Sequence, residues 1–162
     1  MAIWFYSKTP GYEWLSNFAD CRFTLDGVRW PSVEHYYQAQ KYAGSPAAAE
    51  IRRAESADRA RKLGQNRSLT PRADWDAVKL EVMRCAVEAK FTQDRDLGER
   101  LVGTGGEELI HESNTDTFWG RTRDGLGDNW LGVLLMQTRA GLRGTAEQSD
   151  SPKSPVGREF ES

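Results

Sequence analysis

An acid, an amide and an amine recur at helical spacing in the segment from Trp30 to Lys41. Glu34, Gln38 and Lys41 are four and three residues apart, so on an α-helix they share one stripe. At about 1.5 Å of rise per residue, the backbones of Glu34 and Lys41 lie about 10 Å apart. Two long side chains that lean toward each other can bridge this span around one small ligand. One helix face therefore offers an acid, an amide and an amine, flanked by tyrosines.

The residues before this stripe predict a rigid support for it. Pro31 and Ser32 indicate a helix start with Ser32 as N-cap, and the helix is expected to run from about Val33 to Tyr42. Before it, Asp26-Gly27 separates two short strand-like segments, which is a strong signal for a two-residue β-hairpin. The second hairpin strand leads directly into the helix, so the side chains at this junction are held by two rigid elements.

Further elements follow from hydrophobic spacing and turn residues. Short strands are expected at Ile3–Tyr6 and Leu109–Glu112, with an ordered loop at Glu13–Phe18. Helices are expected at residues 47–54 and 57–64, from Thr70-Pro71 to about Phe91, and at residues 94–102 and 130–142. Apolar positions at helical spacing predict the core face of the long helix: Trp75, Val78, Val82, Cys85 and Ala89. From residue 144 to 162 apolar residues are almost lacking, which predicts a disordered tail after a single domain at residues 1–143.

Composition and charge narrow the class of protein. The 162 residues carry a net charge of −2, with 38% hydrophobic and 28% charged residues, as in soluble globular domains. Gross charge therefore predicts neither a nucleic-acid nor a membrane partner. No apolar stretch reaches membrane-spanning length and the N-terminus has no signal pattern, so a cytoplasmic protein is expected. Seven basic residues between Arg52 and Arg72 form a local excess, which can hold phosphate or form a solvated helix face.

Several segments, in this order along residues 4–142, resemble the NADAR domain family. The longest and most specific is Pro31-Ser32-Val33-Glu34-His35-Tyr36-Tyr37-Gln38-Ala39-Gln40-Lys41. The others are Leu15-Ser16-Asn17-Phe18, Asp74-Trp75, Met83, Lys90-Phe91, Leu109, Glu112, Asp116, Phe118-Trp119-Gly120, Gly127, Asn129, Leu131-Gly132 and Met136. The resemblance implies an α+β fold that is predominantly helical, with a small β-sheet or hairpin.

The resemblance also implies cofactor-free hydrolysis of an N-glycosidic bond to ribose. Two substrate groups are associated with the family: ribosylamino-pyrimidine phosphate intermediates of riboflavin synthesis, and ADP-ribose on guanine bases of nucleotides or nucleic acid. The expected partner is therefore a small ribose N-glycoside or an ADP-ribosylated guanine, with no membrane and no stable protein partner implied. A rival hypothesis is a non-catalytic module that binds ADP-ribose or nucleotides through the same aromatic residues and the basic excess.

Three residues are candidates for the catalytic work. Breaking an N-glycosidic bond builds positive charge at the anomeric carbon, so a carboxylate is needed near the sugar and a proton source near the base. Glu34 is the first candidate carboxylate, and its structural alternative is a first-turn acid stabilised by the helix dipole. Asp116 is a second carboxylate or a ribose ligand, and its alternative is a turn-forming aspartate. Lys41 either binds phosphate or hydroxyl as a cation or, with a lowered pKa, forms an imine with the opened sugar; its alternative is a solvent-facing lysine.

Candidate substrate contacts are Asn17, Tyr37, Gln38, Trp119 and Asn129. Trp119 can stack on a pyrimidine or purine, or it is a core tryptophan. Asn17 can hydrogen-bond base-edge groups, or it closes its own loop. Asn129 lies at a predicted helix N-terminus, where phosphate can bind, and simple capping is its alternative.

Histidine and cysteine show no pattern typical of a metal site. His35 and His111 lie far apart in the sequence, and Cys21 and Cys85 have no metal-like or redox spacing. No metal is therefore expected, and His35 is expected to pack or hydrogen-bond at the wall of the pocket.

Overall fold

The computed structural model describes residues 1–149, with side chains described to residue 147. Its four strands are β1 (Ala2–Phe5), β2 (Phe23–Leu25), β3 (Val28–Trp30) and β4 (Glu108–His111). A short 3-10 turn covers Glu13–Leu15. The helices of this part of the chain are α1 (Val33–Lys41), α2 (Pro46–Arg52), α3 (Ala57–Gly64), α4 (Trp75–Gln93), α5 (Arg95–Gly103) and α6 (Trp130–Ser149). The fold is therefore α+β and predominantly helical, as predicted.

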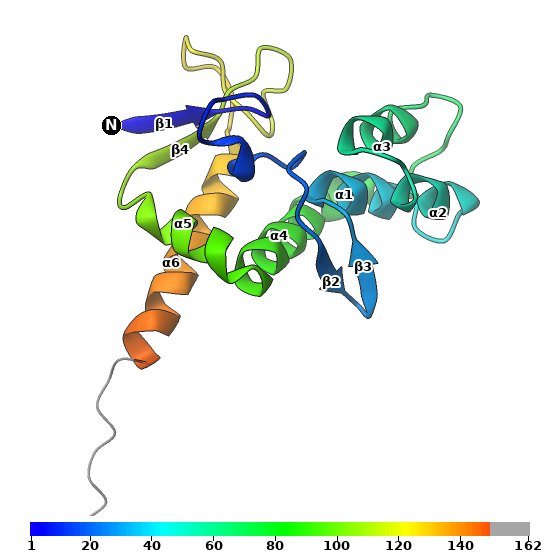
Figure 1. Ribbon diagram of the computed structural model, residues 1–162. Helices are drawn as coiled ribbons and strands as arrows, with labels where there is room; N and C mark the ends of the chain where they lie inside the picture. Colours follow the sequence, from blue (N-terminus) through cyan, green and yellow to red (C-terminus); the bar gives the residue numbers. More distant parts are fainter. Residues whose placement is uncertain (150–162) are drawn as a thin grey trace, which may run out of the picture.

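The elements form two groups that α4 joins (Figure 1). At one end α1 packs against α2 and α3, and at the other end β1 and β4 lie beside α5 and α6. Helix α4 packs against α1 in the first group and against α5 and α6 in the second. One cluster of buried side chains runs through both groups, from Trp30 and Val33 to Leu109 and Leu135. The junction between the two groups is where residues distant in the sequence meet.

The hairpin and the start of α1 form as their residues predict. β2 pairs antiparallel with β3, with Thr24 opposite Arg29. Asp26 and Gly27 have φ values of 52° and 75°, the left-handed pair that a type I′ turn requires. The hydroxyl of Ser32 accepts from the backbone N–H of His35, which caps the helix. Helix α1 thus begins at Val33, directly after the strand.

A second small sheet pairs the N-terminal strand with a strand from the later part of the chain. β1 pairs in parallel with β4, in a register that sets Ile3 opposite Leu109 and Phe5 opposite His111. Both strands occupy the predicted segments, one residue earlier than expected. Because parallel strands end at the same edge of a sheet, the loops after Phe5 and after His111 emerge together.

Helix α4 begins later than its sequence predicts. Thr70-Pro71 was the expected start, but the helix begins at Trp75. The backbone N–H of Arg72 donates to the carbonyl of Lys41 at 2.9 Å, and its side chain pairs with Asp74. These contacts tie the segment before Trp75 to the end of α1 and keep it out of the helix.

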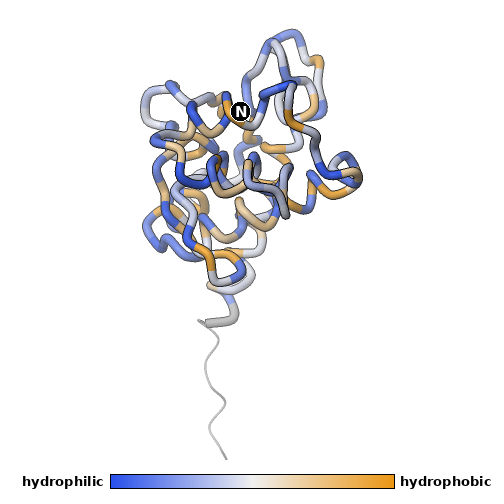
Figure 2. The backbone as a smooth tube through the Cα atoms, turned by 90° about the vertical axis from the view of Figure 1, so that its right-hand side faces the viewer, coloured by the Kyte–Doolittle hydropathy of each residue, from blue (hydrophilic) through white to orange (hydrophobic). Residues whose placement is uncertain are grey.

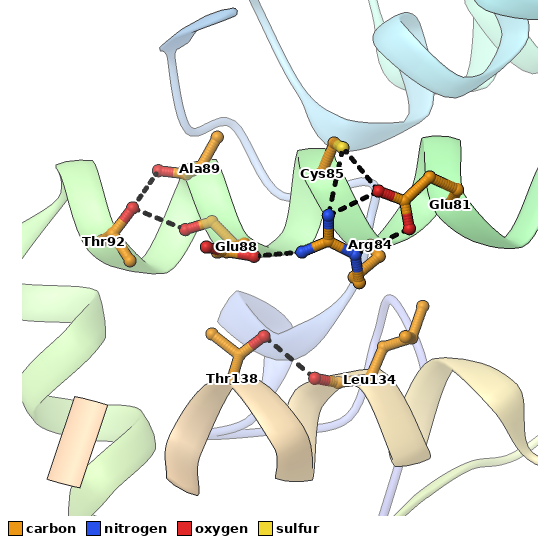
Figure 3. A network of polar contacts seen from close by, with 8 residues as sticks. All are labelled: Glu81, Arg84, Cys85, Glu88, Ala89, Thr92, Leu134 and Thr138. Atoms are coloured by element: carbon orange, nitrogen blue, oxygen red, sulfur yellow. Dashed lines mark hydrogen bonds and ion pairs between the residues drawn. The ribbon is translucent and has the colours of Figure 1, made fainter. Parts of the chain in front are cut away.

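The core face of α4 also differs in part from the prediction. Trp75 and Ala89 are buried, but Val78, Val82 and Cys85 are only half-buried. The remaining buried positions are Met83, Ala86, Val87, Lys90 and Phe91. The covered surface is turned because α1 packs on one side of α4 while α5 and α6 pack on another. The exposed side carries ion pairs of Arg84 with Glu81 and Glu88 (Figure 3).

Helix α6 continues past Leu142 to Ser149. Arg139 donates to the hydroxyl of Thr104, and Arg143 donates to the carbonyl of Gly105, so polar contacts extend the packing where the apolar pattern ends. The predicted tail therefore does not hold for residues 144–149, and residues 150–162 lie outside the described residues. Hydrophilic and hydrophobic residues are interspersed along the backbone (Figure 2). No helix within residues 1–149 is long and apolar enough to cross a membrane.

Candidate functional site

A cavity of about 490 Å³ lies where the two groups of elements meet. Helix α1 supplies one wall with the predicted stripe, and the loops after β1 and β4 lie across from it. Its lining comes from separate segments of the chain: Tyr6, Ser7, Ser16, Asn17, Phe18, Glu34, Tyr37, Gln38, Lys41, Arg61, Gln65, Met83, His111, Glu112, Ser113, Thr115, Asp116, Trp119 and Leu131. The volume suits a small organic ligand.

Glu34 is a buried carboxylic acid in the wall of this cavity. Its side chain is 7% exposed, and Oε1 accepts from Nε2 of Gln38 at 2.9 Å. Burial raises the pKa of Glu34 from 4.5 to about 7, against smaller lowering effects from Gln38 and from the charge of Arg61. The negative charge of Asp116 adds to the rise. A carboxyl group with a pKa near neutrality can both accept and donate a proton at physiological pH.

Gln38 packs against α3 at Gly64, where a larger residue would clash with the Gln38 side chain. A Cβ built on Gly64 would lie 2.1 Å from Oε1 and 2.8 Å from Cβ of Gln38. Oε1 of Gln38 is buried and has no hydrogen-bond partner within the described part of the chain. Gln38 thus uses its amide N–H on Glu34, while the close approach of Gly64 fixes its position.

Lys41 lies at the end of the same stripe and is half-buried. Nζ donates to the carbonyl of Gly64 at 3.3 Å, and the hydroxyl of Tyr42 donates to the same carbonyl at 2.6 Å. Burial lowers the pKa of Lys41, with a further lowering effect from Lys79 and an opposing one from Asp76. Lys41 is therefore neither fully solvated nor paired with a carboxylate in the described structure.

Asn17 lies on a loop that a buried lysine holds in place. The ammonium of Lys90, 1% exposed, donates to the carbonyls of Trp14 at 2.7 Å and Ser16 at 2.9 Å. The carbonyl of Asn17 then accepts from the backbone N–H of Glu34 at 3.1 Å, while its side-chain Nδ2 lies 3.5 Å from Sδ of Met83. The loop and the start of α1 are thus locked together beside the cavity.

Tyr37 and Trp119 form an aromatic wall. Nε1 of Trp119 donates to the hydroxyl of Tyr37 at 3.2 Å, and the two rings meet edge to face at 5.5 Å. Asp116 fixes this loop because its Oδ1 accepts from the backbone N–H groups of Phe118 and Trp119. Trp119 is only 8% exposed, so it belongs to the core and lines the cavity at once.

Asn129 lies outside the cavity lining. It is 1% exposed, and its carboxamide accepts from the N–H of His111 and donates to the carbonyl of Leu109, each at 2.9 Å. Asn129 therefore ties the start of α6 to β4, and both ends of its side chain are occupied. Its backbone takes a left-handed φ of 53°, which asparagine tolerates better than most residues.

The two histidines differ in their relation to the cavity. His35 is a buried residue of α1 outside the cavity lining, and its Nδ1 pairs with the hydroxyl of Ser32 at 2.7 Å and its Nε2 with the carbonyl of Ala54 at 3.0 Å. His35 is packed and hydrogen-bonded as predicted, but His111 is the histidine of the cavity lining. Burial lowers the pKa of His111. In residues 1–149 no three His, Cys, Asp or Glu side chains gather as metal ligands.

Arg61 and His111 are lining residues that the sequence did not single out. Arg61 is one of the seven basic residues between Arg52 and Arg72, but no sequence pattern there predicts which of them lines the cavity. His111 reaches the cavity because β4 pairs with β1, a contact between distant segments that no local pattern announces. One feature of the sequence could have indicated that Lys90 is buried: it lies among the apolar positions of α4.

Known proteins are similar to this chain over most of its length. The profile of the NADAR domain matches residues 4–143. The chain is 41% identical over 138 residues to N-glycosidase YbiA of Escherichia coli K12, covering 85% of this chain and 86% of that protein. It is 41% identical over 146 residues to N-glycosidase Npun_R5314 of Nostoc punctiforme, covering 88% and 94%. It is also 40% identical over 159 residues to riboflavin biosynthesis protein VVA0006 of Vibrio vulnificus, covering 95% of this chain but only 43% of that longer protein.

A solved structure shows the same fold. The NMR structure of the E. coli protein YbiA superposes with a TM-score of 0.82 at 38% identity, covering 96% of this chain and 91% of that chain. The matched region includes the hairpin, α1 and every cavity-lining residue. The chain therefore belongs to the NADAR domain family.

Proposed function

We propose that the protein is an N-glycosidase that hydrolyses the bond between ribose and nitrogen in ribosylamino-pyrimidine phosphate intermediates of riboflavin biosynthesis. One observation carries the proposal: a buried carboxyl, Glu34, with a pKa raised to about 7, in a cavity of small-molecule size. Family membership and the names of the relatives, N-glycosidase and riboflavin biosynthesis protein, support the same reaction and substrate class.

Glu34 is proposed to act at the anomeric carbon. As the C1–N bond breaks, its electron pair passes to the leaving nitrogen, and positive charge builds on the ribose. An ionised Glu34, buried in the pocket wall, stabilises that charge more strongly than it would in bulk water. Water then adds to C1 and loses a proton, and the nitrogen gains one, so the products are the free sugar phosphate and the amino-pyrimidine. Gln38 orients Glu34 through the bond to Oε1.

The pyrimidine base and the ribose hydroxyls of the substrate are proposed to contact other residues of the cavity lining. Trp119 and Tyr37 offer aromatic surface for a pyrimidine, and Asn17 offers an amide at the edge of that surface. Asp116 uses Oδ1 for its own turn, so Oδ2 is the oxygen left to accept from ribose hydroxyls. Asn129, with both ends of its side chain occupied by β4, has no place among these contacts.

Lys41 distinguishes two routes. Burial lowers the pKa of Lys41, which favours the neutral amine that imine formation with an opened ribose requires. A protonated Lys41 instead binds the substrate as a cation. Borohydride with substrate is expected to trap a covalent adduct in the wild type but not in Lys41→Met. Full activity of Lys41→Met with no adduct in either protein removes the imine route.

A substrate panel tests the proposed function. Equal concentrations of enzyme are incubated with the ribosylamino-pyrimidine phosphate and with ADP-ribosylated guanine nucleotide, and released sugar phosphate or ADP-ribose is measured. Release from the first substrate, at the higher kcat/KM, is expected. Release from the guanine conjugate alone assigns the other substrate group. Calorimetric binding of either compound without any product identifies a non-catalytic module and overturns the proposal.

A further inference from the structure

The seven basic residues between Arg52 and Arg72 have different environments in the structure. Lys62 pairs with Asp58 at 2.9 Å, Arg72 pairs with Asp74 at 2.6 Å, and Arg52 lies over the ring of Trp30. Of the seven, Arg61 is the residue that lines the cavity. The structure thus separates one functional candidate from a run that is otherwise engaged or solvated.

Arg61 has no carboxylate within ion-pair distance in the described part of the chain. Its neighbour Asp58, one turn earlier on α3, is already paired with Lys62. The charge of Arg61 is nevertheless felt inside the cavity, since it favours the ionised form of Glu34. An arginine with free donors at a polar cavity is suited to an anionic group of the ligand.

The backbone at Arg61 is fixed relative to the proposed catalytic helix. Three residues after it, the carbonyl of Gly64 accepts from Tyr42 and Lys41 of α1. The missing Cβ of Gly64 also lets α3 approach Gln38 closely. Because α3 is tied to α1 at this point, the backbone of Arg61 is held at a set place relative to Glu34, while the Arg61 side chain is exposed.

The cavity lining beside α3 and after β1 includes uncharged hydrogen-bonding side chains as well as Arg61. Ser7 and Tyr6 enter from the loop after β1, and Gln65 is the C-cap residue of α3. The acidic lining residues enter elsewhere: Glu34 from the first turn of α1, Glu112 and Asp116 from the segment after β4. A ribosyl phosphate has a matching polarity, with positive charge developing at C1 and a phosphate at C5, the other end of the sugar.

We propose that Arg61, assisted by Ser7 and Gln65, forms the subsite for the C5 phosphate of the ribosyl substrate and so sets C1 beside Glu34. This subsite rests on the proposed N-glycosidase function and names the part of the substrate that α3 recognises. Arg61 is a specificity-determining residue: it selects phosphorylated over unphosphorylated ribosides and takes no part in bond breaking.

The test compares the ribosylamino-pyrimidine phosphate with the same compound after phosphatase treatment. Arg61→Gln is expected to lower kcat/KM for the phosphorylated substrate by roughly 10- to 100-fold, mainly through KM, because charged hydrogen bonds to phosphate are lost. The loss is expected to be much smaller for the unphosphorylated compound, which has no phosphate to contact and is affected only through the weaker influence of Arg61 on the ionisation of Glu34. Arg59→Gln, on the same helix but outside the cavity lining, is the matched control and should leave both rates unchanged. An equal loss for both substrates in Arg61→Gln, or no loss, overturns the subsite.

A binding measurement keeps the subsite testable if the reaction itself is wrong. A wild type that cleaves neither compound overturns the proposed function but not the binding of phosphate. Ribose 5-phosphate is then titrated calorimetrically into wild type, Arg61→Gln and Arg59→Gln. Weaker binding in Arg61→Gln alone supports the subsite, and equal affinity or absent binding in all three proteins overturns it.

Discussion

Replacing Glu34 with glutamine is expected to stabilise the protein at neutral and alkaline pH while removing its proposed catalytic carboxylate. Glutamine has nearly the same shape, and its Oε1 can still accept from Nε2 of Gln38. What the substitution removes is a negative charge in a place where burial opposes it. The structure therefore predicts a trade between stability and activity at this residue.

The size of the effect follows from the pKa. Glu34 has a folded-state pKa of about 7 and an ordinary value of 4.5. Below pH 4.5 the group is protonated in both states and contributes no difference. Between these values the unfolded chain ionises first, so stability falls as pH rises, and the loss is complete above about pH 7. At about 1.4 kcal/mol per pH unit, the full penalty is about 3 kcal/mol.

Urea denaturation at two pH values measures this penalty. Wild type and Glu34→Gln are compared at about pH 4.5, the lower limit of the window, and about pH 8.5, above it. The variant is expected to gain about 3 kcal/mol over wild type at the higher pH and little at the lower. Glu50→Gln, an exposed residue on α2, is the control and should differ from wild type at neither pH. A gain that is absent, or the same at both pH values, refutes the reasoning that Glu34 is an unfavourably buried charge.

Three further substitutions test the supporting structure. The unfolding free energy of wild type should rise relative to Lys90→Met as pH increases from about 8 toward 10.5. Burial lowers the folded-state pKa of Lys90, so its charge opposes folding below that range. Parallel pH profiles of the two proteins in urea denaturation would contradict this prediction. Asn129→Ala should cost about 2–4 kcal/mol by thermal or urea unfolding, because two backbone groups of β4 lose their partners, and a loss below the noise of the assay argues against that role. Gly64→Ala should lower kcat although alanine favours helices by about 1 kcal/mol, because its Cβ displaces Gln38 from Glu34; unchanged kinetics would show that Gln38 need not stay in place.

Local signals were sufficient for the hairpin and α1. Asp26-Gly27 takes the left-handed backbone of a type I′ turn, and the hydroxyl of Ser32 caps the helix that follows. Helical spacing then brings Glu34, Gln38 and Lys41 to one wall of the cavity, as predicted from the sequence. These features depend on neighbours within a few residues, so the sequence contains the information in readable form.

Contacts between distant segments could not be predicted in the same way. The delayed start of α4 depends on a hydrogen bond from Arg72 to Lys41, and the place of His111 depends on the pairing of β4 with β1. The sequence presents Asn129 as a candidate phosphate ligand at a helix start. Its side chain instead bonds to the backbone of β4, a contact that depends on tertiary packing and has no local sequence signal. Arg61 could be seen as one cation among seven, but its direction depends on how α3 packs on α1.

The proposed function requires bond breaking beside Glu34. The most direct measurement is the single-turnover release of ribose 5-phosphate from the ribosylamino-pyrimidine phosphate by wild type, Glu34→Gln and the Glu50→Gln control. The predicted result is a rate lower by roughly 100-fold or more in Glu34→Gln, with normal folding and an unchanged rate in Glu50→Gln. Release at the wild-type rate by folded Glu34→Gln would contradict the account.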